Sequence, residues 1–157
     1  MGTSGAIAIF LALVLAPHAS GALSFQFAGP VDTVLVGTGF EGSPPFAAVP
    51  GETMASGHGS FDPGSSGTPT GPGRTDFPQT GHSLSISIPG FEVTLPLVKA
   101  NTSVETLATR FGLTAISEGP QAQALGVDRV DILFGLIGGP GLLPVGVLPT
   151  DLSEKLW

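Results

Sequence analysis

The sequence contains no cysteine, which excludes several kinds of site at once. A disulfide scaffold, a zinc–thiolate site, an iron–sulfur cluster and a thiol nucleophile all depend on cysteine. If the protein is exported, burial and backbone pairing alone must hold it together.

Charged residues are scarce as well, at 11% of the 157 residues, and the basic ones are the scarcest. Five Lys and Arg stand against 12 Asp and Glu, which gives a net charge of −7. Nucleic acids and anionic lipid surfaces are bound through clustered basic residues. The composition therefore argues against both as partners.

Aromatic residues that carry a hydrogen-bonding group on the ring system are nearly absent. There is no Tyr, and the one Trp is Trp157 at the end of the chain. The 10 Phe are expected on core faces. An exposed aromatic platform for stacking sugars is therefore poorly supported.

Glycine and proline are abundant, at 24 and 15 residues, which favours turns and short strands over long helices. The 41% of hydrophobic residues is enough for a core. The length suits one domain.

The N-terminus carries an unbroken apolar run from Ala6 to Ala16, ended by Pro17. It is too short for a membrane-spanning helix, which needs roughly 20 residues. It matches the hydrophobic helix of a secretory signal, although no Lys or Arg precedes it. Ser20 and Ala22 suit a cleavage site before Leu23. We expect residues 1–22 to be a signal peptide, with no membrane span after its removal; the alternative is a buried N-terminal segment.

The clearest structural signal is the stretch from Ser83 to Leu97, SLSISIPGFEVTLPL. Apolar and polar residues alternate on both sides of Pro89-Gly90. This pattern predicts two half-buried strands joined by a tight turn.

Further strands are expected before and after this hairpin, at residues 23–36, 52–61, 127–136 and 142–148. Residues 104–110 fit a short helix or a strand equally well, because capping-box spacing and β-branched residues coincide there. Residues 62–81 are rich in Gly, Pro, Ser and Thr, and we expect them to form a loop outside the core. Such a loop is either disordered or functional.

Short strands separated by Gly/Pro turns predict an all-β fold, an antiparallel β-sandwich or jelly-roll-like domain. The domain is expected over residues 23–150, followed by a C-terminal tail at 151–157.

Calcium is the best-motivated ligand, because loop carboxylates suit hard cations. Asp62 and Asp76 bracket the polar loop, and Asp128 or Asp131 is a candidate third donor. The alternative for Asp62 is turn formation in its Asp-Pro-Gly context. No other cofactor is expected.

A small secreted hydrolase would have to use His58 or His82, the histidines that follow the signal. No G-x-S-x-G nucleophile elbow is present. The alternative is that both are polar residues on strand faces, and no catalytic residue is assigned.

Four segments resemble exported bacterial proteins of the PEP-CTERM type: LSFQFAGPVDTVLVG, GHGSFDPG, SLSISIPGFEVTL and VDRVDILFGL. That class is sorted by an exosortase and is associated with exopolysaccharide and biofilm. The resemblance implies a secreted or cell-surface protein whose partners are extracellular polysaccharide or matrix proteins, and it implies no catalytic residues. Residues 151–157 carry no Pro-Glu-Pro sorting tail, so either the tail is missing from this chain or the protein is secreted free.

These observations lead to one principal expectation of function. The chain is expected to be an exported, non-catalytic β-sandwich protein of the cell surface or extracellular matrix. A Ca²⁺-dependent or glycan-binding module is the first alternative, and a small secreted hydrolase is the second.

Overall fold

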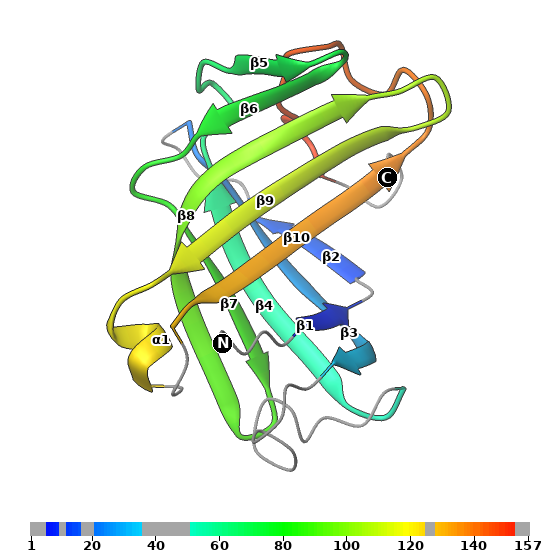
Figure 1. Ribbon diagram of the computed structural model, residues 1–157. Coiled ribbons are helices and arrows are strands. Elements are labelled where there is room, and N and C mark those ends of the chain that lie inside the picture. The colour runs from blue at the N-terminus through cyan, green and yellow to red at the C-terminus, as the bar shows by residue number, and fades with distance from the viewer. Residues whose placement is uncertain (1–5, 10–11, 17–20, 36–50, 125–127, 153–157) are drawn as a thin grey trace.

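The computed structural model describes residues 6–9, 12–16, 21–35, 51–124 and 128–152. Its strands form one 10-stranded antiparallel sheet, shown in Figure 1. The elements before the central hairpin are β1 (Ala6–Ile9), β2 (Ala12–Ala16), β3 (Leu23–Leu35), β4 (Met54–Phe61), β5 (Thr68–Gly71) and β6 (Arg74–Pro78). The remaining elements are β7 (Ser83–Ile88), β8 (Phe91–Val104), β9 (Thr109–Ser117), α1 (Pro120–Ala124) and β10 (Val130–Gly138). The prediction of an all-β, antiparallel fold is confirmed.

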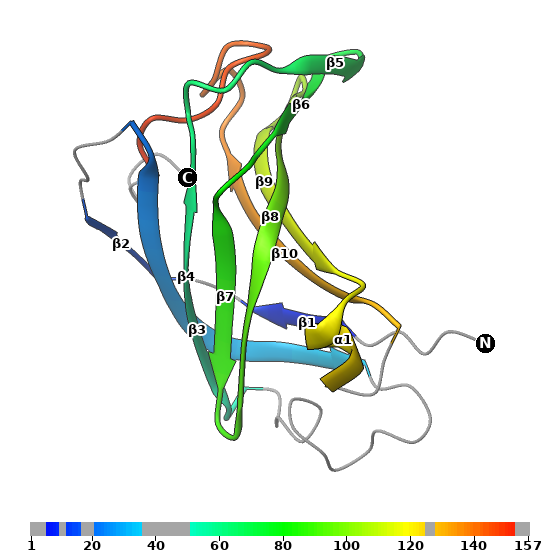
Figure 2. The same ribbon diagram turned by 90° about the vertical axis from the view of Figure 1, so that its left-hand side faces the viewer.

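The sheet bends so that its two halves form two layers (Figure 2). The first layer contains β2, β3, β4, β7 and the start of β8. The second contains β5, β6, the end of β8, β9 and β10. Sequence neighbours mostly pair with each other, and the two layers are joined through the shared strand β8.

Strand β8 passes from one layer to the other at Val98. Its register with β9 shifts between Leu97 and Lys99, and Val98 is left exposed. An extra residue of this kind bends a strand and increases its twist. The irregularity therefore explains how one strand pairs with β7 in the first layer and with β6 and β9 in the second.

The expected hairpin from Ser83 to Leu97 is confirmed as β7 and β8. Gly90 in its turn has φ of 79°, a conformation that side chains with a Cβ rarely adopt. Leu84 and Leu95 are directly opposite each other and fully buried, so the alternation in the sequence does point the apolar side chains inward.

The core lies between the layers and is dominated by phenylalanine. The ring of Phe134 on β10 is 4.7 Å from Phe25 and 5.5 Å from Phe27 on β3, measured between centroids. Phe61 and Phe111 lie 5.0 Å apart and extend the same cluster. Aromatic burial of this kind is a large contribution to the stability of the fold.

The expectation that residues 62–81 stay outside the core was wrong. β5 and β6 form a hairpin there, β6 pairs with β8, and Phe77 is 1% exposed. Thr75, Phe77 and Gln79 alternate toward the core, and this short inward pattern was hidden among Gly and Pro. Gly67 leaves space for the Phe77 ring, because a Cβ there would collide with it.

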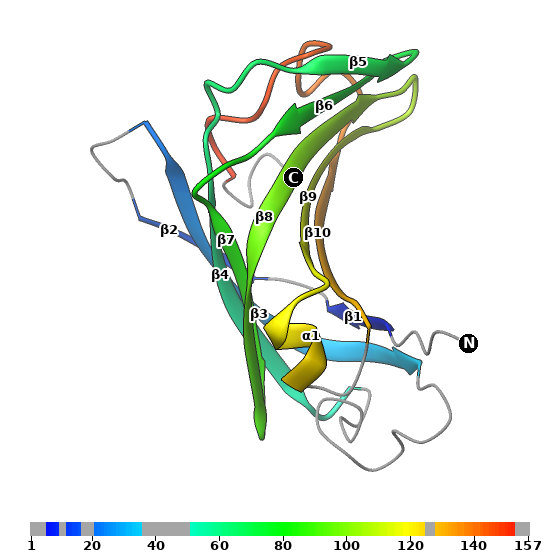
Figure 3. The same cartoon turned by 60° about the vertical axis from the view of Figure 1, so that its left-hand side comes forward.

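The structure also differs from the sequence predictions at residues 142–148 and at α1, and it decides between helix and strand at residues 104–110. Residues 142–148 form turns and not a strand, because Pro144 within the stretch, and Pro140 and Pro149 on either side of it, lack the backbone N–H that a sheet needs. Residues 105–108 form a turn between β8 and β9, so the strand alternative at 104–110 is closer than the helix. The short helix α1 was not predicted; it lies where β9 leads into β10 (Figure 3).

The helix expected in the signal segment is not seen in the described part of that segment. Ala6–Ile9 and Ala12–Ala16 are strands that pair with β3, while residues 1–5, 10–11 and 17–20 lie outside the described residues. The edge of β3 offers hydrogen-bonding groups to an extended apolar segment, which accounts for the strand conformation.

Candidate functional site

The outer surface of the first layer carries a continuous set of polar side chains. Strands β3, β4, β7 and β8 lie side by side, and alternate residues along each point away from the core. We call this set the polar face. Its members are Gln26, Ser56, His58, Ser60, Ser85, Ser87, Glu92 and Thr94.

A row of hydrogen bonds runs across the centre of the polar face. His58 is opposite Ser85, and Ser85 is opposite Thr94. The Ser85 hydroxyl lies 3.2 Å from Nε2 of His58 and 2.7 Å from Oγ1 of Thr94. Because one hydroxyl has a single proton and two lone pairs, Ser85 donates at most one of these bonds and accepts at least one. The row therefore fixes the orientation of three polar side chains from three strands.

A shallow hollow of about 440 Å³ lies on this face. Its lining includes Gln26, Ser56, His58, Ser87 and Glu92. These side chains come from four different strands, so only the folded sheet brings them together. Phe27, Ala28 and Ile86 also line the hollow, and its hydrogen-bonding side chains carry hydroxyl, imidazole and amide groups and one carboxylate, that of Glu92.

Glycine on β4 allows close packing beneath the hollow. A Cβ on Gly57 would collide with the carbonyl oxygen of Ser85 and with the ring of Phe27. A larger residue there would push β4 away from β7. The row of hydrogen bonds therefore depends on Gly57 as well as on its own members.

A second histidine–serine contact lies near the start of β7, where Nδ1 of His82 is 3.1 Å from the hydroxyl of Ser60. Thus both of the histidines considered for a hydrolase contact serine. However, Ser85 is only 2% exposed and its hydroxyl is shared with Thr94. A nucleophile has to reach its substrate, whereas the buried Ser85 hydroxyl contacts His58 on β4 and Thr94 on β8.

Asp62 forms a turn at the end of β4. Its carboxylate accepts a hydrogen bond from the N–H of Gly64 at 2.8 Å, and its carbonyl oxygen accepts one from the Ser65 hydroxyl. The buried side chain of Gln79 accepts from the Asp62 N–H and donates to the Asp62 carbonyl. These contacts match the turn-forming alternative.

Asp76 lies on β6 beside two basic side chains. Its Oδ2 accepts a hydrogen bond from Nζ of Lys99 at 2.6 Å, and Oδ1 is 3.7 Å from Nε of Arg74. Within the described ranges, no group of three or more His, Asp or Glu is placed to hold a metal ion. A calcium site built on Asp62 and Asp76 thus stays a prediction from the sequence.

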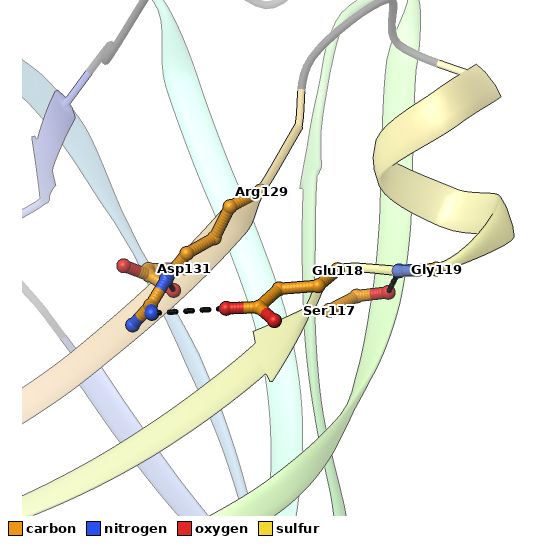
Figure 4. A network of polar contacts seen from close by, with 5 residues as sticks. All are labelled: Ser117, Glu118, Gly119, Arg129 and Asp131. Atoms are coloured by element: carbon orange, nitrogen blue, oxygen red, sulfur yellow. Dashed lines mark hydrogen bonds and ion pairs between the residues drawn. The ribbon is translucent and has the colours of Figure 1, made fainter. Parts of the chain in front are cut away.

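Asp131, one of the two alternatives for a third donor beside Asp128, belongs to a network that joins β9 to β10 (Figure 4). Arg129 donates to Asp131 at 2.8 Å and to Glu118 at 3.1 Å. The hydrogen bond and charge of Asp131, followed by those of Glu118, raise the pKa of Arg129 above its ordinary value. Ser117 accepts a hydrogen bond from the N–H of Gly119 in the same connection.

The polar face was only partly visible in the sequence. His58 was singled out, and the serine alternation in SLSISI indicated a polar strand face. The partners of His58 were not predicted, because Ser85 is distant along the chain and meets it only through the register of β4 and β7.

Comparison with known proteins found no matching family model, no matching curated protein and no matching solved structure. In the part of the chain that is described, no helix has the length and apolar character needed to cross a membrane.

Proposed function

We propose that the protein is an exported, non-catalytic β-sheet protein of the cell surface or extracellular matrix, and that its polar face contacts uncharged polysaccharide. The observation that carries the second half of the proposal is the polar face, on which four strands bring hydroxyl, imidazole and amide groups side by side. The apolar N-terminal run and the small residues before Leu23 support export.

The chemistry of the polar face suits a ligand rich in hydroxyl groups. Serine, threonine and neutral histidine each donate and accept hydrogen bonds, as sugar hydroxyls do. The hollow is open and spans several strands, which fits an extended chain better than a small molecule that needs a deep pocket.

The net charge of the protein favours uncharged polysaccharides over anionic ones as ligands. A net charge of −7 repels polyanions at low ionic strength, and Glu92 places a carboxylate at the hollow itself. We therefore expect uncharged polysaccharides to bind and anionic ones to be rejected.

The test is affinity electrophoresis in native gels containing a neutral or an anionic polysaccharide. The chain should be retarded by neutral polysaccharide, and a Gln26→Ala/His58→Ala variant should lose most of the retardation. Thr70→Ala, which removes an exposed side chain on β5 in the other layer, is the matched control. Equal retardation of the double variant and the wild type would exclude the polar face as the binding surface.

Export is tested separately in a bacterial host. Secreted protein should begin at Leu23, which N-terminal sequencing detects. Protein that stays in the cytoplasm with Met1 in place would contradict the proposal.

A further inference from the structure

Strand β10 is an open edge of the second layer. It pairs with β9 along its whole length, and no strand in the described part of the chain pairs with its other side. Figure 1 shows it as the outermost strand of that layer. An unpaired edge presents backbone N–H and C=O groups in the spacing that another strand needs.

The other edge of the same layer is protected, and β10 is not. β5 is a four-residue strand that contains Pro69, and its register with β6 is irregular. Short length, proline and irregularity are the usual means of preventing edge-to-edge pairing. β10 has nine residues and no proline.

The outer face of β10 is unusually apolar. Leu133 is 75% exposed and Ile137 is 64% exposed, with Gly135 between them. The acidic residue of the strand, Asp131, is already paired with Arg129. Edge strands normally carry charged side chains at such positions, which prevent pairing with another strand. This edge therefore has the composition of a contact surface.

The sequence of β10 is self-complementary when two copies run antiparallel. In a pairing centred on Gly135, Leu133 lies opposite Ile137 of the second copy, and Ile137 opposite its Leu133. On the inner face, Phe134 lies opposite Leu136 of the second copy. Every large exposed apolar side chain of the strand then gains an apolar partner, and directly opposite side chains of a sheet lie in contact.

Charge favours the same register. Centring on Gly135 sets Asp131 opposite Gly139 of the second copy, so no charged side chain faces another or faces an apolar one. A pairing centred on Phe134 would set Asp131 opposite Ile137, and one centred on Leu133 would set Arg129 opposite Ile137. Burying a charge against an apolar side chain is costly.

We propose that β10 is the interface of a two-fold dimer, in which the β10 strands of two copies pair antiparallel about Gly135. The second layers of the two copies then form one continuous sheet. The polar face lies on the other layer and stays open in this arrangement, so the dimer does not depend on polysaccharide binding.

The register is tested by single cysteines, because the full chain has none of its own. Gly135→Cys fits the strand, since a Cβ there has its nearest neighbour, the Phe111 carbonyl oxygen, at 3.8 Å. In the proposed dimer the two introduced thiols face each other. Leu133→Cys is the matched control, because its two thiols would be about 13 Å apart along the strands, beyond disulfide reach.

Mild oxidation of the full chain should give a covalent dimer with Gly135→Cys and little with Leu133→Cys, read on a non-reducing gel. Cross-linking of Leu133→Cys without Gly135→Cys would overturn the proposed register.

Association itself is tested by sedimentation velocity. Wild-type full chain should sediment as a dimer. The dissociation constant of the Leu133→Glu dimer should be higher by about tenfold or more, because the substitution places a charge against Ile137 of the second copy. Met54→Glu, which adds the same charge at a 57% exposed apolar residue on β4, should behave like the wild type. A wild-type chain that stays monomeric up to its solubility limit, or a Leu133→Glu variant that dimerises equally well, would overturn the proposal.

Discussion

The two layers of the sheet have similar inner faces and different outer faces. Both contribute phenylalanine rings to one core, with Phe25 and Phe61 from the first layer and Phe111 and Phe134 from the second. Outside, the first layer presents exposed polar side chains such as Gln26, His58 and Glu92, whereas β10 in the second presents exposed Leu133 and Ile137.

Folding constrains the inner faces of the two layers, whereas the outer faces can differ according to what they bind. Inner faces must be apolar in both layers, because the core is shared. Outer faces have no such requirement, and a polar exterior is the usual outcome for an antiparallel sheet. Where an outer face departs from that outcome, as at β10, the departure needs a reason other than folding. The chain thus has a hydrogen-bonding surface on one side and an apolar edge on the other.

The largest loss of stability is expected from a substitution in the core that the inner faces of both layers share. Phe134→Ala removes a ring that contacts Phe25, Phe27 and Phe111 across the core. Removing a buried phenylalanine costs about 3–5 kcal/mol of unfolding free energy. Chemical denaturation followed by circular dichroism measures the loss.

The control for Phe134→Ala lies on the outer side of the same strand. Ile137 is 64% exposed, and surface substitutions usually change the free energy of unfolding by at most about 0.5 kcal/mol. To exclude the contribution of dimerisation, both variants should be compared in the Leu133→Glu background. If Ile137→Ala and Phe134→Ala cost the same, the distinction between inner and outer faces of β10 is wrong.

The sequence was sufficient to predict the elements whose pattern is local. The alternation on both sides of Pro89-Gly90 defined β7 and β8, because a period of two and a turn residue need no distant partner. The same holds for β10, predicted as residues 127–136 and observed as Val130–Gly138. The helix α1 had a usable signal as well, since proline is favoured at the first position of a helix and Pro120 occupies it.

What the sequence did not predict depends on contacts between distant residues. Phe77 is in the core because β6 pairs with β8, and its Gly/Pro-rich surroundings gave no local sign of that pairing. The row of hydrogen bonds through Ser85 depends on the register of three strands. Registers are set by how whole faces pack, so a pattern read along one strand identifies the polar residues but not their partners.

A smaller loss of stability is expected from removing the hydrogen bonds of Ser85 on the polar face. Ser85→Ala removes the contacts with both His58 and Thr94. Each hydrogen bond contributes about 0.5–1.5 kcal/mol, so we expect the loss of both to lower the unfolding free energy by about 1–3 kcal/mol. Denaturant titration measures this value.

Ser87→Ala is the control for the polar face. Ser87 lies on the same face of β7, and its side chain makes no hydrogen bond to the described residues. We expect a change within about 0.5 kcal/mol. Equal losses for Ser85→Ala and Ser87→Ala would show that general burial on β7, and not the hydrogen-bonded row, stabilises this face.

The smallest effect is expected from the charged network of the second layer. Arg129→Gln breaks the contacts with Asp131 and Glu118, and all three side chains are at least 40% exposed. Exposed ion pairs contribute little and are screened by salt. We expect a small fall in melting temperature that shrinks further in about 1 M salt.

The raised pKa of Arg129 also fixes the sign of the pH dependence. A cation whose pKa is raised on folding stabilises the native state below its unfolded pKa and loses that contribution only as pH rises through the folded pKa. Since both values lie far above neutral pH, the effect of Arg129→Gln should be constant from neutral to mildly alkaline conditions. Melting curves over that range measure it, with Arg74→Gln on β6 as a comparison in the same layer. A fall that exceeds that of Ser85→Ala would mean that the charged network, and not the polar face, is the stronger tie between neighbouring strands.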